Sequence, residues 1–237
     1  MSSSGQSLVI VCDLDDTLYL ERDYVASGFE AVGAWAAEQL SLADFGHVAW
    51  QLFEAGHRER IFDAALQELG VGGSSGLIEQ MVAVYRSHKP AIALRDDVHD
   101  FLGGGYGLGG LAIVTDGYRE AQENKVAALQ LGALGFSPIV VTDIWGREYW
   151  KPHPRAFRLI ADSLDSKSCH LVYVADNATK DFLTPNQLGW TTIQISRPGG
   201  LHTSPPPTPD HAPMMRIDSF AQLPDALGIA PCHSTES

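Results

Sequence analysis

Residues 8–18 read LVIVCDLDDTL and place three acidic side chains directly after a run of five apolar residues. The run itself, residues 8–12, is short and rich in β-branched residues, which is typical of a strand buried on both faces. Core strands seldom end in so much like charge, because carboxylates that lie close together repel one another. The stretch therefore predicts a buried strand with a chemical site at its carboxyl end.

Four further apolar runs follow along the chain, and helical patterns separate them. The expected strands are residues 111–115, 138–143, 171–176 and 191–196. Strands that alternate with helices of this length form a parallel sheet with helices on both faces. The sequence therefore predicts an α/β fold built on a doubly wound, Rossmann-like parallel sheet.

One long segment interrupts this alternation. From about residue 23 to residue 89, apolar residues recur at helical spacing, with breaks at Gly46, Gly70 and the run GGSSG at 72–76. This pattern predicts three or four helices and no strand. Because the segment lies between the first and second strands, we interpret it as a helical domain inserted into the sheet domain.

The expected domain organisation has three parts. The sheet domain comprises residues 1–20 and 90–200, the helical insertion residues 21–89, and a C-terminal tail residues 201–237. The tail contains the proline-rich run SPPPTP, which is typical of extended or poorly ordered chain. We expect one short helix at most in the tail, within IDSFAQLPDAL.

The composition limits the partners that the chain can have. Hydrophobic residues make up 45% of its 237 residues, enough for a sizeable core. The formal net charge of −13 repels phosphate backbones and anionic membrane surfaces. No stretch approaches the roughly 20 apolar residues that span a bilayer. We therefore expect neither nucleic acid nor a membrane as a partner.

The cysteines and the N-terminus favour a cytoplasmic location. The three cysteines are widely spaced and form no CxxC pair. An odd number of cysteines without a secretory signal favours reduced thiols. The opening residues lack the basic segment of a signal peptide, and Asp13 interrupts the apolar run that follows.

Polar side chains follow four of the expected strands. In chain order they are Asp13, Asp15, Asp16 and Thr17; Thr115 and Asp116; Lys151; and Asp176 and Asp181. Ligands of open parallel sheets bind beyond the carboxyl ends of the strands. We therefore expect these carboxylates, hydroxyls and one ammonium group at a single edge of the sheet. Asp16 is expected to help set the turn after the first strand.

These residue types point to phosphoryl chemistry. Clustered carboxylates need a cation, and oxygen ligands of this kind suit Mg²⁺. An aspartate beside Mg²⁺ can attack phosphorus, and a second acid nearby can protonate the leaving oxygen and later activate water. A hydroxyl and an ammonium group, here Thr115 and Lys151, can hold the transferring phosphoryl group.

The four motifs DLDDT, TDG, KP and DNATKD resemble those of the haloacid dehalogenase-like (HAD) hydrolase superfamily, in the order in which that family has them. The resemblance covers residues 8 to about 200. It implies that Asp13 is the nucleophile and that Asp15 is the general acid/base. It also implies that the helical insertion is a C1-type cap, which closes over the site and selects the substrate.

The resemblance extends to the remaining site residues. It implies that the phosphate is bound by Asp13, Thr115, Asp116 and Lys151. It implies that Mg²⁺ is held by Asp13, Asp176 and the backbone carbonyl of Asp15. Thr17 and Asp181 are expected to support these groups, Asp181 by orienting Lys151 or a metal-bound water.

Asp15 separates two branches of the family. Members that remove halide from 2-haloacids lack an acid at this position, because a departing halide needs no proton. The resemblance therefore implies a Mg²⁺-dependent phosphatase that hydrolyses a small phosphorylated metabolite through an aspartyl-phosphate intermediate. Sugar phosphates, nucleotides and phosphorylated acids are all candidate substrates.

Two alternatives stay open. A phosphomutase would share every catalytic residue and differ in how its cap excludes water. A regulatory or binding protein on a retired catalytic scaffold belongs to a different class, and the competent residue at each motif position argues against it. Release of inorganic phosphate would favour the phosphatase, and isomerisation without release would favour the phosphomutase. Inactivity against a broad panel of phosphate esters would favour the non-catalytic protein.

Four basic or imidazole side chains of the insertion are candidates for contacting an anionic substrate. They are His57, Arg58, Arg86 and His88. A solvated helix face explains most charges of this kind, and a role in substrate binding rests only on analogy with enzyme lids.

Overall fold

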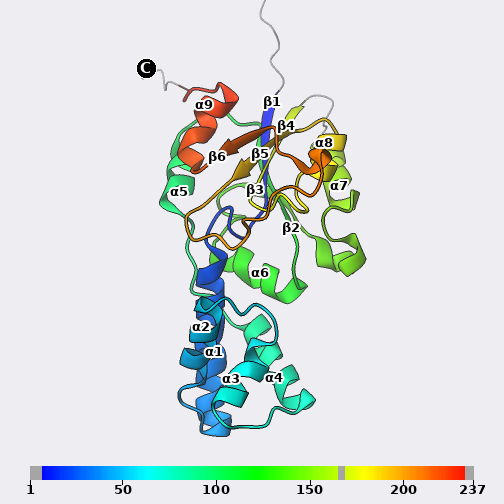
Figure 1. Ribbon diagram of the computed structural model, residues 1–237. Helices are drawn as coiled ribbons and strands as arrows, with labels where there is room; N and C mark the ends of the chain where they lie inside the picture. The colour runs from blue at the N-terminus through cyan, green and yellow to red at the C-terminus, as the bar shows by residue number, and fades with distance from the viewer. Residues whose placement is uncertain (1–6, 165–168, 233–237) are drawn as a thin grey trace, which may run out of the picture. The chain divides into compact units, whose positions relative to one another are not determined.

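The computed structural model describes residues 7–164 and 169–232, which divide into two compact units (Figure 1). One unit contains the chain up to Glu21 and from Ala93 onward, and the other comprises Arg22–Ile92. Residues 1–6 of the expected sheet domain and 233–237 of the expected tail lie outside the described residues.

The first unit is built on a sheet of six parallel strands in the order β3-β2-β1-β4-β5-β6. The strands are β1 (Ser7–Cys12), β2 (Gly110–Thr115), β3 (Phe136–Val141), β4 (Cys169–Ala175), β5 (Thr191–Ile195) and β6 (Met215–Ile217). Strand β1 lies inside the sheet, between β2 and β4, which explains why its residues 9–12 are apolar and buried. The predicted doubly wound parallel sheet is confirmed.

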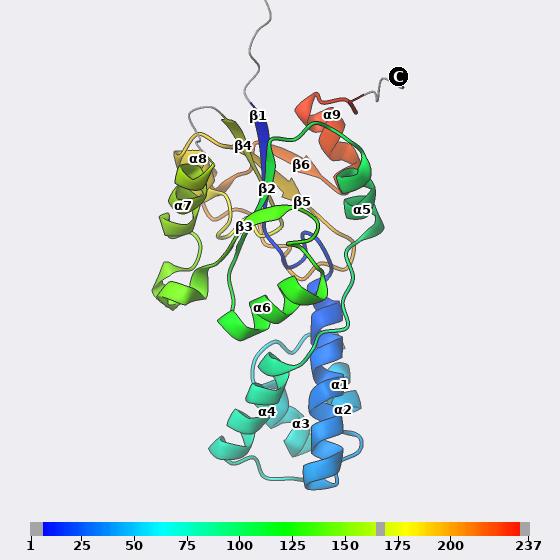
Figure 2. The ribbon, with the colours of Figure 1, turned by 180° about the vertical axis from the view of Figure 1, so that it is seen from behind.

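Helices cover both faces of this sheet. The helices of the unit are α5 (Asp96–Gly103), α6 (Arg119–Ala128), α7 (Arg155–Ser163), α8 (Leu183–Gln187) and α9 (Leu223–Leu227). Helices α7 and α8 lie on one face, where Phe157, Ile160 and Phe182 pack against Val11 and Tyr173 of the strands. Helices α5 and α9 lie on the other face, and α6 lies beyond the carboxyl ends of β1 and β2 (Figures 1 and 2).

Short 3₁₀ turns complete the sheet unit. They are η1 (Thr142–Trp145), η2 (Arg147–Tyr149), η3 (Pro209–His211) and η4 (Phe220–Gln222). Turns η1 and η2 carry the chain from the end of β3 to Lys151. No helix among the described residues is long and apolar enough to cross a membrane.

The segment expected to be a separate tail is part of the sheet unit instead. Its residues 215–217 form the edge strand β6, which pairs with β5 in parallel register. Sequence patterns miss a strand of three residues that follows a proline-rich run, because so short a run carries no periodicity. The short helix expected near the end of the chain is α9.

The second unit consists of helices in the residues that the structure describes. They are α1 (Glu21–Leu40), whose first residue belongs to the sheet unit, α2 (Phe45–Glu54), α3 (Ile61–Glu68) and α4 (Ser75–Ser87). Aromatic side chains form its core, with ring centroids of Phe29 and Phe62 6.0 Å apart. Trp50 stacks on Phe53 at 5.3 Å, so these aromatic residues pack against one another as a helical core requires.

The helix break expected at Gly46 is wrong. Gly46 lies in the first turn of α2, which begins at Phe45. A Cβ on Gly46 would lie 2.8 Å from the carbonyl oxygen of Phe29, and one on Gly33 would lie 3.0 Å from Gly46 Cα. Helices α1 and α2 therefore touch through facing glycines, and Gly46 marks a close approach between helices, not a helix end.

Candidate active site

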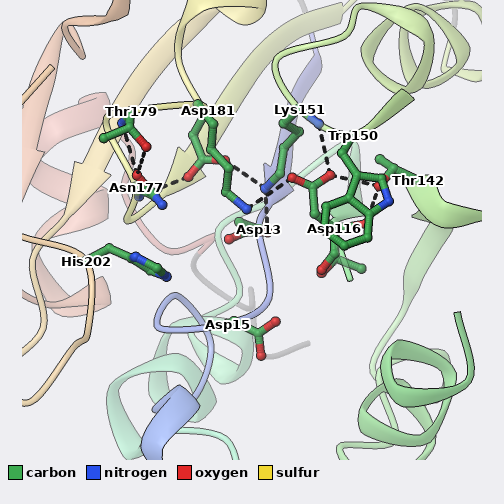
Figure 3. A network of polar contacts seen from close by, with 12 residues as sticks. Asp13, Asp15, Asp116, Thr142, Trp150, Lys151, Asn177, Thr179, Asp181 and His202 are labelled. Carbon is green, nitrogen blue, oxygen red and sulfur yellow. Dashed lines mark hydrogen bonds and ion pairs between the residues drawn. The ribbon is translucent and has the colours of Figure 1, made fainter. Parts of the chain in front are cut away.

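The four sequence motifs meet at the carboxyl edge of the sheet (Figure 3). Asp13 directly follows β1, Thr115 is the last residue of β2, and Asp176 directly follows β4. Lys151 comes after η2 and points back toward Asp13. These residues lie together because neighbouring parallel strands end at the same edge.

Lys151 is the centre of the cluster. Its Nζ lies 2.7 Å from Oδ1 of Asp13 and 2.7 Å from Oδ1 of Asp181, and it donates to the hydroxyl of Tyr173 at 3.1 Å. Burial alone would lower the pKa of Lys151, but the charges of Asp13 and Asp181 raise it well above its ordinary value. Lys151 is therefore a fixed positive charge beside the expected nucleophile.

Three buried carboxylates adjoin this ammonium group. One oxygen each of Asp13, Asp176 and Asp181 lies within 4.8 Å of the others. Burial raises the pKa of Asp13 to about 6, with repulsion from Asp181 adding to the shift and Lys151 opposing it. Burial, together with the charges of Asp181 and Asp13, raises the pKa of Asp176 well above its usual range. The cluster carries more negative charge than Lys151 can neutralise.

The cluster fits a hard divalent cation. The buried Oδ2 of Asp176 has no hydrogen-bond partner among the described residues, which is costly unless another positive group takes it. Gln194 holds the loop after β4 by donating to the backbone carbonyl of Asp176 at 2.9 Å. Asp181, in contrast, is already held by Lys151 and by the backbone N–H of Asn177 at 2.9 Å. Asp13 and Asp176 are thus the side chains with capacity left for a cation.

Asp15 lies apart from this cluster (Figure 3). Its Oδ1 accepts from Lys125 Nζ at 2.7 Å and from the hydroxyl of Tyr19, and its Oδ2 accepts from Gln122 at 3.0 Å. Burial would raise the pKa of Asp15, but the charge of Lys125 and these hydrogen bonds hold it below its usual value. Two carboxylates separated by one residue therefore have opposite environments.

The Asp116 side chain contacts three groups of the protein. Its Oδ1 accepts from the Thr142 hydroxyl at 2.7 Å and from the backbone N–H of Lys151 at 3.0 Å. Its Oδ2 pairs with Lys180 at 3.0 Å. Both oxygens of this carboxylate are therefore engaged by protein groups. These contacts hold Lys151 and Lys180 in place. Contact of Asp116 with phosphate stays a prediction.

The other predicted residues of the sheet unit are placed as follows. Thr115 is fully buried, and its hydroxyl donates weakly to the carbonyl of Asp116 at 3.5 Å. The Thr17 hydroxyl is buried with no partner among the described residues, and the Thr17 carbonyl accepts from Arg197 at 2.8 Å. Asp16 accepts from the backbone N–H groups of Glu21 and Leu201, which fits its expected role in the turn.

The candidate substrate contacts of the insertion belong to the helical unit. Arg58 donates to the carbonyls of Phe53 at 2.6 Å and His57 at 2.9 Å, and its guanidinium lies over the Phe53 ring. His88 is buried and its Nδ1 lies 2.6 Å from the carbonyl of Tyr85. Arg58 and His88 thus contact their own unit. Nothing in the structure tests whether a substrate contacts these side chains, so that role stays a prediction for all four residues, His57, Arg58, Arg86 and His88.

Sequence reasoning missed several residues of the site. They are Tyr173, Lys180, Gln122 and Lys125. Lys180 stands inside the fourth motif, next to Asp181, so its place near the site could have been foreseen. Gln122 and Lys125 lie on a polar helix, where nothing in the sequence separates a buried polar residue from an exposed one.

The chain is similar to known proteins in its family model and in its structure. A family model described as haloacid dehalogenase-like hydrolase matches residues 8–189. No curated protein sequence matches the chain. Among solved structures, YfnB from Bacillus subtilis, a HAD-hydrolase bound to magnesium, is 21% identical with a TM-score of 0.67, covering 95% of this chain and 100% of that one.

Two further structures have the same fold with different activities in their descriptions. A predicted phosphoglycolate phosphatase from Haemophilus somnus is 17% identical with a TM-score of 0.62, covering 94% of this chain and 99% of that one. The L-2-haloacid dehalogenase from Xanthobacter autotrophicus is 16% identical with a TM-score of 0.58, covering 93% and 98%. At these identities the likeness shows the fold alone.

Proposed function

The chain belongs to the haloacid dehalogenase-like hydrolase family, and on that premise we propose that it is a Mg²⁺-dependent phosphatase. Its substrate is a small phosphomonoester, and Asp13 carries the phosphoryl group as an aspartyl-phosphate. The observation that carries the proposal is the pair of carboxylates at the end of β1. Asp13 lies against Lys151 in the acidic cluster, whereas Asp15 is held apart by α6.

The separate positions of the two carboxylates suit the two tasks of phosphate-ester hydrolysis, and Asp15 must enter the first step protonated although Lys125 favours its ionised form. A carboxylate oxygen of Asp13 attacks phosphorus, the bond from phosphorus to the ester oxygen breaks, and the departing oxygen takes a proton from the carboxyl group of Asp15. Asp15 then takes a proton from water as the water oxygen attacks the phosphoryl group. The bond between Asp13 and phosphorus breaks, which releases phosphate and restores both residues.

Lys151 and Thr115 would hold the phosphoryl group during both steps. The buried ammonium group of Lys151 is aimed at Asp13 without any rearrangement, so its charge is in place when negative charge gathers on the phosphoryl oxygens. Asp13 and Asp176 would hold Mg²⁺, with the Asp15 carbonyl as the third protein ligand that the resemblance implies. The cation would supply positive charge that offsets the carboxylates and the phosphate together.

Dehalogenation is the rival activity within the family, since dehalogenases share this fold. A halide leaves without a proton, so a dehalogenase has no use for the acid that this chain holds at Asp15. The cluster also carries more carboxylates than Lys151 can neutralise, which favours a reaction that uses a bound divalent cation, as phosphate-ester hydrolysis does in this proposal. Phosphomutase and non-catalytic readings stay as alternatives, without a specific observation in their favour.

A phosphate-release screen over metabolite esters tests the proposal. Sugar phosphates, nucleotides and phosphorylated acids are each assayed with Mg²⁺ and with a chelator, and Asp13→Asn is the inactive comparison. We expect release that depends on Mg²⁺ and that Asp13→Asn abolishes while the variant stays folded. Full activity in Asp13→Asn, or no release from any ester, would contradict the proposal. Isomerisation of a sugar phosphate without release would favour the mutase.

A further inference from the structure

Two buried polar side chains of α6 converge on Asp15. Gln122 donates to Oδ2 of Asp15 at 3.0 Å, and Lys125 lies 2.7 Å from Oδ1. Gln122 is 2% exposed and Lys125 4% exposed, although α6 is otherwise a polar helix with few apolar residues. Residues three apart share one face of a helix, so both side chains leave α6 in the same direction.

Burying an amide and an ammonium group is unfavourable unless both find partners. Core helices normally direct apolar residues inward, and this face of α6 instead presents two hydrogen-bond donors to one carboxylate. Tyr19, fully buried, provides a third donor, to the same Oδ1 that Lys125 contacts. The three donors leave Asp15 with one orientation, and its side chain keeps 16% of its surface accessible.

Gln122 also connects the first two motifs. The same Nε2 that donates to Asp15 donates to the backbone carbonyl of Asp116 at 2.6 Å. Space for this amide exists because the next residue is Gly117, where a Cβ would lie 2.3 Å from Gln122 Nε2. The turn after β2 thus fixes Gln122, and Gln122 fixes Asp15.

We propose that Gln122 and Lys125 are positioning residues, which hold the Asp15 carboxyl group where it reaches the leaving oxygen of the substrate. This inference rests on the proposed phosphatase function. Neither residue touches the phosphoryl group itself, and each acts through Asp15. Nothing in the sequence motifs assigns them a role.

A positioning role predicts a dependence on the leaving group that a merely structural role does not. An ester whose leaving group departs as a stable anion needs little help from a proton, whereas a more basic leaving group needs Asp15 in place. The quotient kcat/KM reports the steps up to the departure of the leaving group, so it isolates this first proton transfer from the later attack of water.

The test compares p-nitrophenyl phosphate with phenyl phosphate, which differ little in size but strongly in the basicity of the leaving group. The variants are Lys125→Met and Gln122→Leu, with Lys125→Arg as the conservative change. Glu120→Gln is the matched control, because Glu120 is an exposed acid on the same helix. Each variant is first checked for a cooperative thermal unfolding transition, which shows that it is folded, and is then assayed with Mg²⁺.

We expect Gln122→Leu, which removes a donor without changing the charge beside Asp15, to lower kcat/KM for phenyl phosphate by on the order of 10- to 100-fold, and that for p-nitrophenyl phosphate by only about threefold. Lys125→Met should show the same selectivity with a smaller loss, because removing the ammonium group also favours the protonated acid. Lys125→Arg should recover part of that loss, and Glu120→Gln should match the wild type. Equal losses of kcat/KM on both esters would overturn the positioning role and leave the proposed phosphatase function standing. A wild type that hydrolyses neither ester would count against the proposed function itself.

Discussion

Lys151 and Asp181 form an ion pair from which solvent is excluded, with 2.7 Å between Nζ and Oδ1 and no exposed surface on either side chain. Asp13 shares the same ammonium group at the same distance. The two carboxylates come from separate strand ends and therefore share the single ammonium group of Lys151. The motif lysine thus has a structural task, holding the β1 and β4 loops together, in addition to the proposed binding of phosphate.

Lys151→Met should be strongly destabilising. It leaves Asp13 and Asp181 buried without their shared partner, and removing one member of a buried pair costs about 3–5 kcal/mol. Urea unfolding at pH 7 in the presence of a chelator measures the free energy of unfolding. A loss below about 1 kcal/mol would show that the two acids do not depend on Lys151 for stability.

Lys180→Met provides the matched control for that experiment. Lys180 also pairs with an acid, Asp116, but 31% of its side chain is exposed, so water can replace the missing contact. We expect a loss of about 1 kcal/mol or less, as for other pairs near the surface. A loss as large as that of Lys151→Met would mean that exposure does not set the difference between the two lysines.

The fold and the motif residues could be predicted because each depends on a local pattern. A β-branched run that ends in Asp13 marks both a buried strand and the end at which the polar cluster lies, so the sheet and the position of the candidate site follow together. Gln122 and Lys125 could not be predicted, because their importance comes from facing Asp15 across about 110 residues of chain. For the same reason the sequence does not predict the contacts of the Asp116 carboxylate with Lys151 and Lys180, which come from other strand ends.

Mg²⁺ should stabilise the protein through Asp13 and Asp176. A ligand that binds only the folded state adds about 2.7 kcal/mol at a concentration 100 times its dissociation constant. Thermal unfolding with increasing Mg²⁺, compared with a chelator, measures this effect. Asp176→Asn should abolish most of it, because it removes the charge of the carboxylate whose buried Oδ2 has neither a hydrogen bond nor an ion pair among the described residues. If Mg²⁺ stabilised Asp176→Asn as much as the wild type, the cation would bind at a different site.

Asp97 should make stability depend on pH in the acid range. Burial would raise its pKa, but hydrogen bonds from Arg197, Ser219 and the Phe220 backbone hold the pKa below its usual value. A carboxyl group of this kind stabilises the fold above its unfolded pKa of about 3.9, and the contribution is lost as the pH falls through the lower folded value.

Asp97→Asn should therefore lower the free energy of unfolding at pH 7 by about 1–3 kcal/mol. The difference from wild type should narrow below about pH 4, where the wild-type carboxylate also becomes protonated. Asp100→Asn is the control, since Asp100 is an exposed acid on the same helix. Urea unfolding at pH 7 and at pH 3 measures both variants, and a deficit that stays constant across this range would exclude the charge as its cause.

Gly117→Ala should destabilise the turn after β2 for two separable reasons. Gly117 has φ of +131°, a region that residues with a Cβ rarely adopt, and the added methyl group would collide with Gln122. We expect a loss of about 1–3 kcal/mol. In a background of Gln122→Ala the collision disappears and only the backbone strain remains, so Gly117→Ala should cost less there. A double-mutant cycle by urea unfolding measures this difference, and a coupling energy of zero would show that Gln122 does not press against the turn.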